Sequence, residues 1–180
     1  MVAKGMGLDN RIGSKFLHAG PGFGGSCFPK DLAALVQTGE RVGYPMQIAG
    51  AAALINEQQR GRMIEKITKE VGGLKGKTFA MLGLSFKPNT NDLRDAPALA
   101  IAQELMKQGA TVRAYDPAAL EEACQIVSGL VPCKDAYEAA QGADALILMT
   151  EWNQFRTLDF DRLKTLLRQP IFFDLRNVYE

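Results

Sequence analysis

The sequence predicts an α/β protein, in which a long central helix is followed by a Rossmann-like, doubly wound parallel sheet. Two observations support this. Residues 45–71 repeat apolar side chains at helical spacing. After residue 76, short apolar segments alternate with helical ones, as is typical of a parallel sheet covered on both faces. We therefore expect a helical region over residues 1–75 and a sheet over residues 76–180, separated near Gly72-Gly73 and Gly76.

The first region is expected to begin irregularly, because Gly20-Pro-Gly-Phe-Gly-Gly25 cannot form a regular helix. A helix is predicted from Pro29, with Ser26 as a capping residue nearby, and Gly43-Tyr-Pro45 ends it. The next helix should run from Pro45 to Val71. Its first half is almost entirely small or apolar, so we expect it to be buried on most sides, with a partner subunit as one candidate for covering it.

The second region should contain strands and helices in alternation. Strands are predicted at residues 78–84, 111–115, from Cys133, 145–149 and 171–174, and helical segments at 96–108, 121–127, 137–141 and 158–167. Ligands of such sheets bind beyond the carboxyl ends of the strands. The candidate binding edge therefore comprises residues 85–94, Asp116, residues 150–152 and Arg176.

Composition excludes several classes of protein. The 180 residues are 47% hydrophobic and 23% charged with a net charge of +1, which is ordinary for a globular protein and gives no electrostatic footprint for nucleic acid. No run approaches the roughly 20 apolar residues that a membrane span needs. We expect a soluble, cytoplasmic protein. Three spaced cysteines and one histidine predict neither a metal site nor a disulfide scaffold.

The glycines at 20–25 satisfy G-x-G-x-x-G, the pattern of a dinucleotide-binding turn. That interpretation is disfavoured, because residues 16–19 hardly form a strand and Pro29, not Gly25, opens the helix. We expect the glycines to let the backbone approach a ligand closely.

Cys27 is the candidate nucleophile. It stands just ahead of a predicted helix start, where unpaired N–H groups and the helix dipole favour a thiolate. Lys30 adds positive charge one turn away, and Asp31 could orient a water molecule or hold a proton. A buried structural cysteine beside a capped helix would give the same pattern, and the residues alone favour neither interpretation.

A second candidate segment spans residues 83–97, between the first strand and the first helix of the sheet, where a phosphate normally sits. It places Lys87 and Arg94 at the ligand edge, and Phe86 could stack on a base. A solvated loop is the alternative. Asp116 follows the second strand at the position that often holds a ribose, but an Asp-Pro turn is the favoured interpretation.

These segments together resemble a known family. Arg11-Ile-Gly13, Phe16-Leu17, Gly20-Pro-Gly-Phe-Gly-Gly-Ser-Cys-Phe-Pro-Lys-Asp31 and Gly83-Leu-Ser-Phe-Lys-Pro88 with Asp92-Leu-Arg94 are similar to signatures of the UDP-glucose/GDP-mannose dehydrogenase family. The resemblance covers nearly the whole chain and is strongest to members that act on UDP-glucose. It implies oxidation of UDP-glucose to UDP-glucuronate with two NAD, through a thiohemiacetal and a thioester on Cys27.

The resemblance also implies a role for each matching residue. Catalysis would fall to Cys27, with Asp31 assisting the water. Lys30 and Arg94 would contact the cofactor. The implied substrate contacts are Arg11 (toward the neighbouring subunit's substrate), Phe16, Leu17, His18, Ala19, Gly20, Phe23, Gly24, Phe86, Lys87 and Arg176.

The sequence departs from the family pattern in one major respect, since nothing in it matches the amino-terminal NAD-binding half. NAD would therefore be bound mainly by an absent domain, and we expect the chain alone to bind UDP-sugar weakly and not to turn it over. A homodimer through the 45–71 helix is expected. The alternatives are a GDP-mannose or UDP-N-acetylmannosamine dehydrogenase, or a non-catalytic nucleotide-binding and dimerisation module built on that helix.

Overall fold

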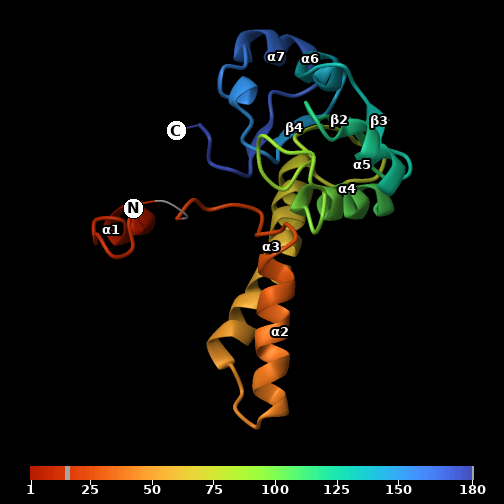
Figure 1. Ribbon diagram of the computed structural model, residues 1–180. Helices are drawn as coiled ribbons and strands as arrows, with labels where there is room; N and C mark the ends of the chain where they lie inside the picture. Colours follow the sequence, from red (N-terminus) through yellow and green to blue (C-terminus); the bar gives the residue numbers. More distant parts are fainter. Residues whose placement is uncertain (15–16, 180) are drawn as a thin grey trace.

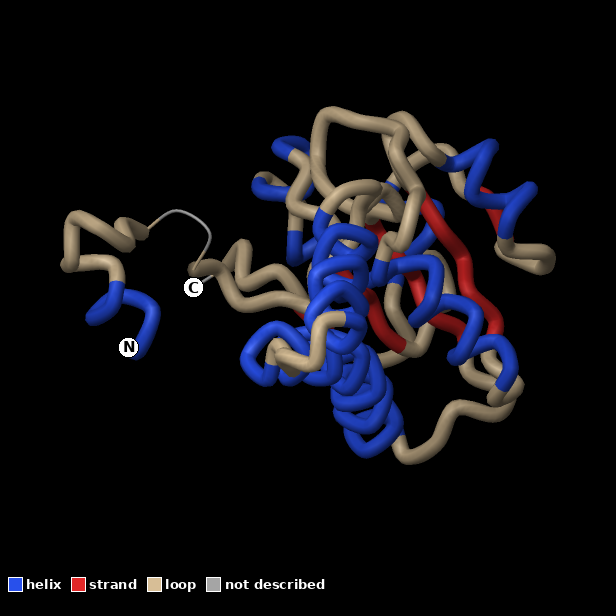
Figure 2. Tube along the Cα trace, turned by 60° about the horizontal axis from the view of Figure 1, so that its bottom comes forward, coloured by secondary structure: helices blue, strands red, loops and turns tan. Residues whose placement is uncertain are grey.

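The computed structural model describes residues 1–14 and 17–179. The sheet is five-stranded and parallel, in the order β3-β2-β1-β4-β5. Figure 2 draws its strands in red. Its strands are β1 (Thr78–Leu82), β2 (Thr111–Tyr115), β3 (Val131–Pro132), β4 (Ala145–Leu148) and β5 (Phe172–Asp174). The helices between them are α4 (Pro97–Lys107), α5 (Leu120–Ile126), α6 (Ala136–Ala140) and α7 (Phe160–Leu166), with a 3-10 turn, η1 (Asn153–Arg156), after β4.

Helices cover both faces of the sheet, which confirms the predicted architecture. Successive side chains of β1 point to opposite faces. Phe79 and Met81 join one buried cluster with α3, α4 and α5, whereas Ala80 and Leu82 join the other with α6 and α7. All four are fully buried. Because β1 and β4 are buried on both faces, their sequences are almost continuously apolar rather than alternating.

The amino-terminal region forms a helical arm that extends away from the sheet (Figure 1). It consists of α2 (Phe28–Arg41) and α3 (Gln47–Val71), and the carboxyl-terminal half of α3 enters the core through Met63, Ile67 and Val71. A short helix, α1 (Val2–Met6), buries none of its residues and was not predicted.

The predicted burial of the first half of α3 is wrong for the single chain. Ile48, Leu54 and Ile55 are 88%, 54% and 52% exposed. The only helix packed alongside this half is α2 (Figure 1), so the apolar side chains on its other faces have no partner within the described part of the chain.

Some predicted boundaries also move. The first strand ends at Leu82 rather than Leu84, because Gly83 has a φ of +88° and a Cβ there would lie 2.5 Å from that of Thr150. The strand expected from Cys133 is Val131–Pro132, although the Cys133 amide still donates to the Ala114 carbonyl at 2.9 Å.

Candidate functional site

Cys27 caps the amino terminus of α2. The helix begins at Phe28, one residue before the predicted start, and the Cys27 carbonyl accepts from the Asp31 amide at 2.9 Å. No side chain caps this end, so the expected role of Ser26 as a cap is wrong; its hydroxyl instead lies 3.6 Å from the Cys27 sulfur. The thiol is exposed.

The glycines before Cys27 pack against the loop between β1 and α4. A Cβ on Gly24 would lie 2.1 Å from the Asp95 carbonyl oxygen, and one on Gly25 would lie 2.7 Å from the Phe86 ring. The Gly25 amide donates to the Arg94 carbonyl at 2.9 Å. The absence of side chains at these positions therefore lets two segments, far apart in the sequence, approach backbone to backbone. This contact is with protein, and it brings Cys27 beside the second candidate segment.

Two cations lie close to the thiol. The hydrogen bond that Lys30 donates to Asp31, at 2.6 Å, raises the pKa of Lys30, and the charge of Cys27 adds to that rise. The hydrogen bonds from Arg94 to Asp92, at 2.9 and 2.6 Å, raise the pKa of Arg94, and Cys27 again contributes. Lys30, Asp31 and Arg94 are exposed, whereas the Asp92 side chain is 17% exposed, so a charged ligand could exchange most readily for the Asp31 carboxylate.

Phe86 and Lys87 stand next to this group. Phe86 is half-buried against Gly25, and the Lys87 ammonium lies 5.2 Å from the centroid of the Phe86 ring. Lys87 itself is exposed. The structure thus gathers Cys27, Lys30, Asp31, Phe86, Lys87 and Arg94 on one side of the loop contact.

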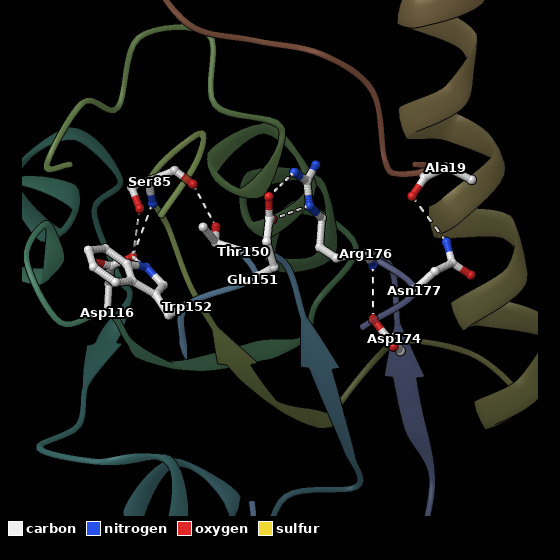
Figure 3. A network of polar contacts seen from close by, with 9 residues as sticks. All are labelled: Ala19, Ser85, Asp116, Thr150, Glu151, Trp152, Asp174, Arg176 and Asn177. Atoms are coloured by element: carbon white, nitrogen blue, oxygen red, sulfur yellow. Dashed lines mark hydrogen bonds and ion pairs between the residues drawn. The ribbon is translucent and has the colours of Figure 1, made fainter. Parts of the chain in front are cut away.

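Asp116 is a structural anchor at the end of β2 (Figure 3). Its side chain is buried and accepts from the amides of Ala118 and Ala119 through one oxygen. The other oxygen accepts from the Leu84 amide, from the Ser85 amide and hydroxyl, and from the Trp152 indole, at 2.7 to 3.2 Å. The favoured interpretation as an Asp-Pro turn is supported, because both oxygens are engaged and neither is free for a ribose.

Arg176 lies after β5 and forms a bidentate ion pair with Glu151, at 2.6 and 2.8 Å (Figure 3). Its remaining terminal nitrogen would be 3.1 Å from a Cβ on Gly20. Next to it, the Asn177 side chain donates to the Ala19 carbonyl at 3.1 Å. Arg176 and Asn177 therefore hold the start of the segment from Leu17 to Cys27, here called the cysteine loop, against the carboxyl end of the sheet.

The pair between Glu151 and Arg176 should make stability depend on pH. Burial opposes ionisation of Glu151, but the hydrogen bond and charge of Arg176 outweigh it and lower the pKa of this carboxyl. A lowered folded-state pKa contributes stability that is present above the unfolded value and is lost as pH falls through the folded one. We expect Glu151→Gln to lower the free energy of unfolding by about 1–3 kcal/mol at pH 7. In urea unfolding, the difference should shrink as pH falls below the unfolded value of about 4.3 and vanish only below the lowered folded pKa; a difference that stays constant down to about pH 2 would contradict this account.

The three thiols should differ in reactivity. Burial raises the pKa of Cys124 and of Cys133, which lowers their thiolate fraction, whereas Cys27 is exposed. We expect iodoacetamide at pH 7.5 to modify Cys27 about tenfold or more faster than either. Peptide mass spectrometry over time measures this, with Cys27→Ser as the control that removes the fast signal. Faster modification of Cys133 would contradict the arrangement.

Other expected contacts are not brought to this site. Arg11 pairs with Asp9 at 2.7 Å in the segment beside α1, which lies apart from the sheet in both views. His18 is exposed, and Phe16 lies outside the described residues. Sequence reasoning missed Asn56, Gln59 and Asn177, which hold the loop, whereas Glu151 fell within the predicted binding edge at residues 150–152. For Asn56 and Gln59 a signal existed, since they occupy the helical face that continues into Met63 and Ile67.

The pattern of motifs, the fold and the loop contact together match one family. Residues 1–58 match the central domain, and residues 80–180 the UDP binding domain, of the UDP-glucose/GDP-mannose dehydrogenase family. The chain belongs to this family. It is 51% identical over 179 residues to UDP-glucose 6-dehydrogenase of Rhizobium meliloti (strain 1021), covering 99% of this chain and 41% of that protein. It is 48% identical to UDP-glucose 6-dehydrogenase TuaD of Bacillus subtilis (strain 168), covering 99% and 39%.

Solved structures of dehydrogenases in this family share the fold. A UDP-glucose dehydrogenase from the hyperthermophilic archaeon Pyrobaculum islandicum superimposes with a TM-score of 0.86 at 32% identity, over 97% of this chain and 43% of that one. A GDP-mannose dehydrogenase from Pseudomonas aeruginosa gives 0.78 at 25% identity, over 98% and 42%. The chain thus spans about two fifths of the length of these family members. Among its described residues, no helix is both long and apolar enough to cross a membrane.

Proposed function

We propose that this chain carries the thiol-bearing and UDP-binding portion of a UDP-glucose 6-dehydrogenase, which oxidises UDP-glucose to UDP-glucuronate with two NAD. One observation supports this above the others: an exposed cysteine caps α2 and is held by glycines against the segment that carries Phe86, Lys87 and Arg94. UDP-glucose is favoured over GDP-mannose because the relatives with 51% and 48% identity are UDP-glucose 6-dehydrogenases, whereas the GDP-mannose enzyme is 25% identical. The portion would divide into residues 1–75 and 76–180.

Cys27 would form the covalent intermediate. Its thiolate adds to the C6 aldehyde carbon, and the resulting oxyanion takes a proton to give a thiohemiacetal. Loss of the C6 hydride, for which NAD would be the acceptor, and of the hydroxyl proton gives a thioester. Water cleaves the thioester to a carboxylate and the free thiol. Sulfur suits both halves, because it is nucleophilic at neutral pH and leaves readily. Asp31, which is 65% exposed beside the thiol, would orient the water.

The remaining residues would hold the sugar nucleotide. Phe86 offers a ring and Lys87 a charge beside the loop, and Arg176 keeps one guanidinium nitrogen directed at Gly20. The segment from Leu17 to Gly20, with Phe23 and Gly24, would lie along the substrate. His18 is exposed there.

NAD does not fit this chain as a complete site. The glycines at 20–25 follow no strand in the described residues, and Asp116, at the place of a ribose ligand, has both oxygens engaged. When bound, NAD accepts the hydrides; Lys30 and Arg94 are the residues here that could reach its phosphates. We expect the chain alone to bind UDP-glucose weakly and to form no NADH.

A chimera tests the proposal, with the 180 residues replacing the matching segment of the Rhizobium meliloti enzyme. We expect NADH formation with UDP-glucose, and none or far less with GDP-mannose. An inactive chimera that folds and binds UDP-glucose would overturn the proposal. Activity that prefers GDP-mannose would reassign the substrate.

The helical arm would form a homodimer interface. Its exposed apolar side chains are Leu35, Val42, Tyr44, Ile48, Leu54 and Ile55. Side chains of this kind on one projecting hairpin are typical of a surface that a second subunit covers. We expect Ile48→Glu to shift the protein from dimer to monomer in sedimentation equilibrium, raising the dissociation constant about tenfold or more. Glu57→Lys is a charge-changing control on the same helix, and an unchanged dimer in Ile48→Glu would contradict the interface.

A further inference from the structure

Two side chains of α3, Asn56 and Gln59, fix the cysteine loop to this helix. The Asn56 carboxamide oxygen accepts from the Phe23 amide at 2.7 Å, and its nitrogen donates to the Phe23 carbonyl at 3.1 Å. One side chain therefore satisfies both backbone groups of one residue, as a neighbouring strand would. Close by, Gln59 donates to the Gly20 carbonyl at 3.1 Å, so the loop is tied to the same helix at two points.

The loop backbone is shaped to receive this side chain. Gly22 has a φ of +117°, which favours glycine, and a Cβ there would lie 2.9 Å from the Asn56 oxygen. Any other residue at position 22 would displace the amide. Gly22 and Asn56 are thus mutually adapted. Gly22 lies five residues before Cys27, and Asn56 lies seven residues before Met63, the first buried residue of α3.

The hydrogen bonds to Phe23 also restrict the chain before and after Cys27. The Phe23 ring contacts that of Phe28, the first residue of α2, with centroids 6.0 Å apart. Cys27 lies between these two residues. Asn56, in turn, belongs to the face of α3 that continues through Met63 and Ile67 into the core, so it is anchored to a rigid element.

We infer that Asn56 is a positioning residue for Cys27. By holding the Phe23 backbone, it keeps the loop against the segment carrying Phe86 and thereby fixes where the thiol stands. Its catalytic meaning rests on the proposed function, whereas its effect on the loop does not.

The test compares Asn56→Asp with the unsubstituted chain, and uses Gln58→Glu as the matched control because it adds a carboxylate at an exposed position two residues away. At pH 7, an ionised carboxyl group can still accept from the Phe23 amide, but it cannot donate to the Phe23 carbonyl and its oxygen repels that carbonyl oxygen, so the paired contact should open. We expect hydrogen-exchange protection of the Phe23 amide to fall about tenfold or more, with protection in β1 unchanged. The rate of Cys27 alkylation should change in the same variant and not in Gln58→Glu.

Lowering the pH should restore the contact in the Asn56→Asp variant, and it would not do so if the substitution only destabilised the fold. A protonated carboxyl group both donates and accepts, so near pH 3.5 the Asn56→Asp variant should recover much of the protection at Phe23 relative to Gln58→Glu. Protection at Phe23 that equals that of the unsubstituted chain at pH 7, or no recovery in acid, would overturn the inference.

The chimera separates this inference from the proposed function. Asn56→Asp should lower kcat about tenfold or more and leave KM within about twofold, because the thiol acts after substrate binds. A raised KM with unchanged kcat would overturn the positioning role. If the unsubstituted chimera is inactive, the proposed function fails, and the exchange and alkylation results still decide whether Asn56 positions the loop.

Discussion

Cys27→Ser should reduce turnover of UDP-glucose by the chimera on the order of 10³-fold or more, with little change in its affinity for UDP-glucose. A serine hydroxyl has a far higher pKa than a thiol and is a poor leaving group from an acyl intermediate, so both covalent steps suffer. Steady-state NADH formation and calorimetry with UDP-glucose measure the two effects separately.

Cys124→Ser serves as the control, because Cys124 lies on α5 and is only partly exposed. It should retain turnover within about twofold. If Cys27→Ser turns over at an unchanged rate, the chain is a non-catalytic nucleotide-binding module, and the role assigned to the thiol is wrong.

Asp116→Asn should produce the largest loss of stability. Both oxygens of this buried carboxylate accept hydrogen bonds, and in the amide one of them becomes an N–H₂ group that faces donors. Buried donors left without an acceptor cost about 1–3 kcal/mol each, so we expect a loss of about 3 kcal/mol and a fall in Tm of roughly 10 °C.

Thermal unfolding followed by circular dichroism measures this change. Asp161→Asn is the matched control, because that side chain is 95% exposed, and its Tm should move by less than about 2 °C. A similarly small shift for Asp116→Asn would show that the anchor is dispensable.

Most of the fold could be predicted from the sequence, because the central strands are apolar on both faces and alternate with helices. The place of Cys27 just ahead of a helix was also predictable, since Pro29 marks a first helical turn, although Ser26 and not Cys27 was expected to cap it. The hydrogen bonds that hold the loop before Cys27 could not be predicted. The helical face that carries Asn56 and Gln59 can be read from the sequence. The backbone groups that these two side chains and Asn177 contact are distant in sequence, and no local pattern identifies them. For Gly24 and Gly25, the prediction of close approach was correct in kind, but the observed neighbour is the chain itself.

The exposed helical arm shows a second feature that the sequence alone does not determine. An apolar stretch predicts that something covers it, but cannot say whether that is the same chain or another. Ile48 and Leu54 illustrate this, because their composition is that of a core and their surroundings are open.

The close backbone contact between Gly24 and the Asp95 carbonyl joins the two regions of the chain, so separating them should change the site. Residues 1–75 expressed by themselves would retain every atom of the thiol and its helix, yet would lose the surface that holds the glycines in place. A peptide or truncated version should therefore react with simple alkylating agents while lacking a defined orientation toward a sugar. The orientation of the thiol therefore depends on the contact between the two regions, and neither region would fix it alone.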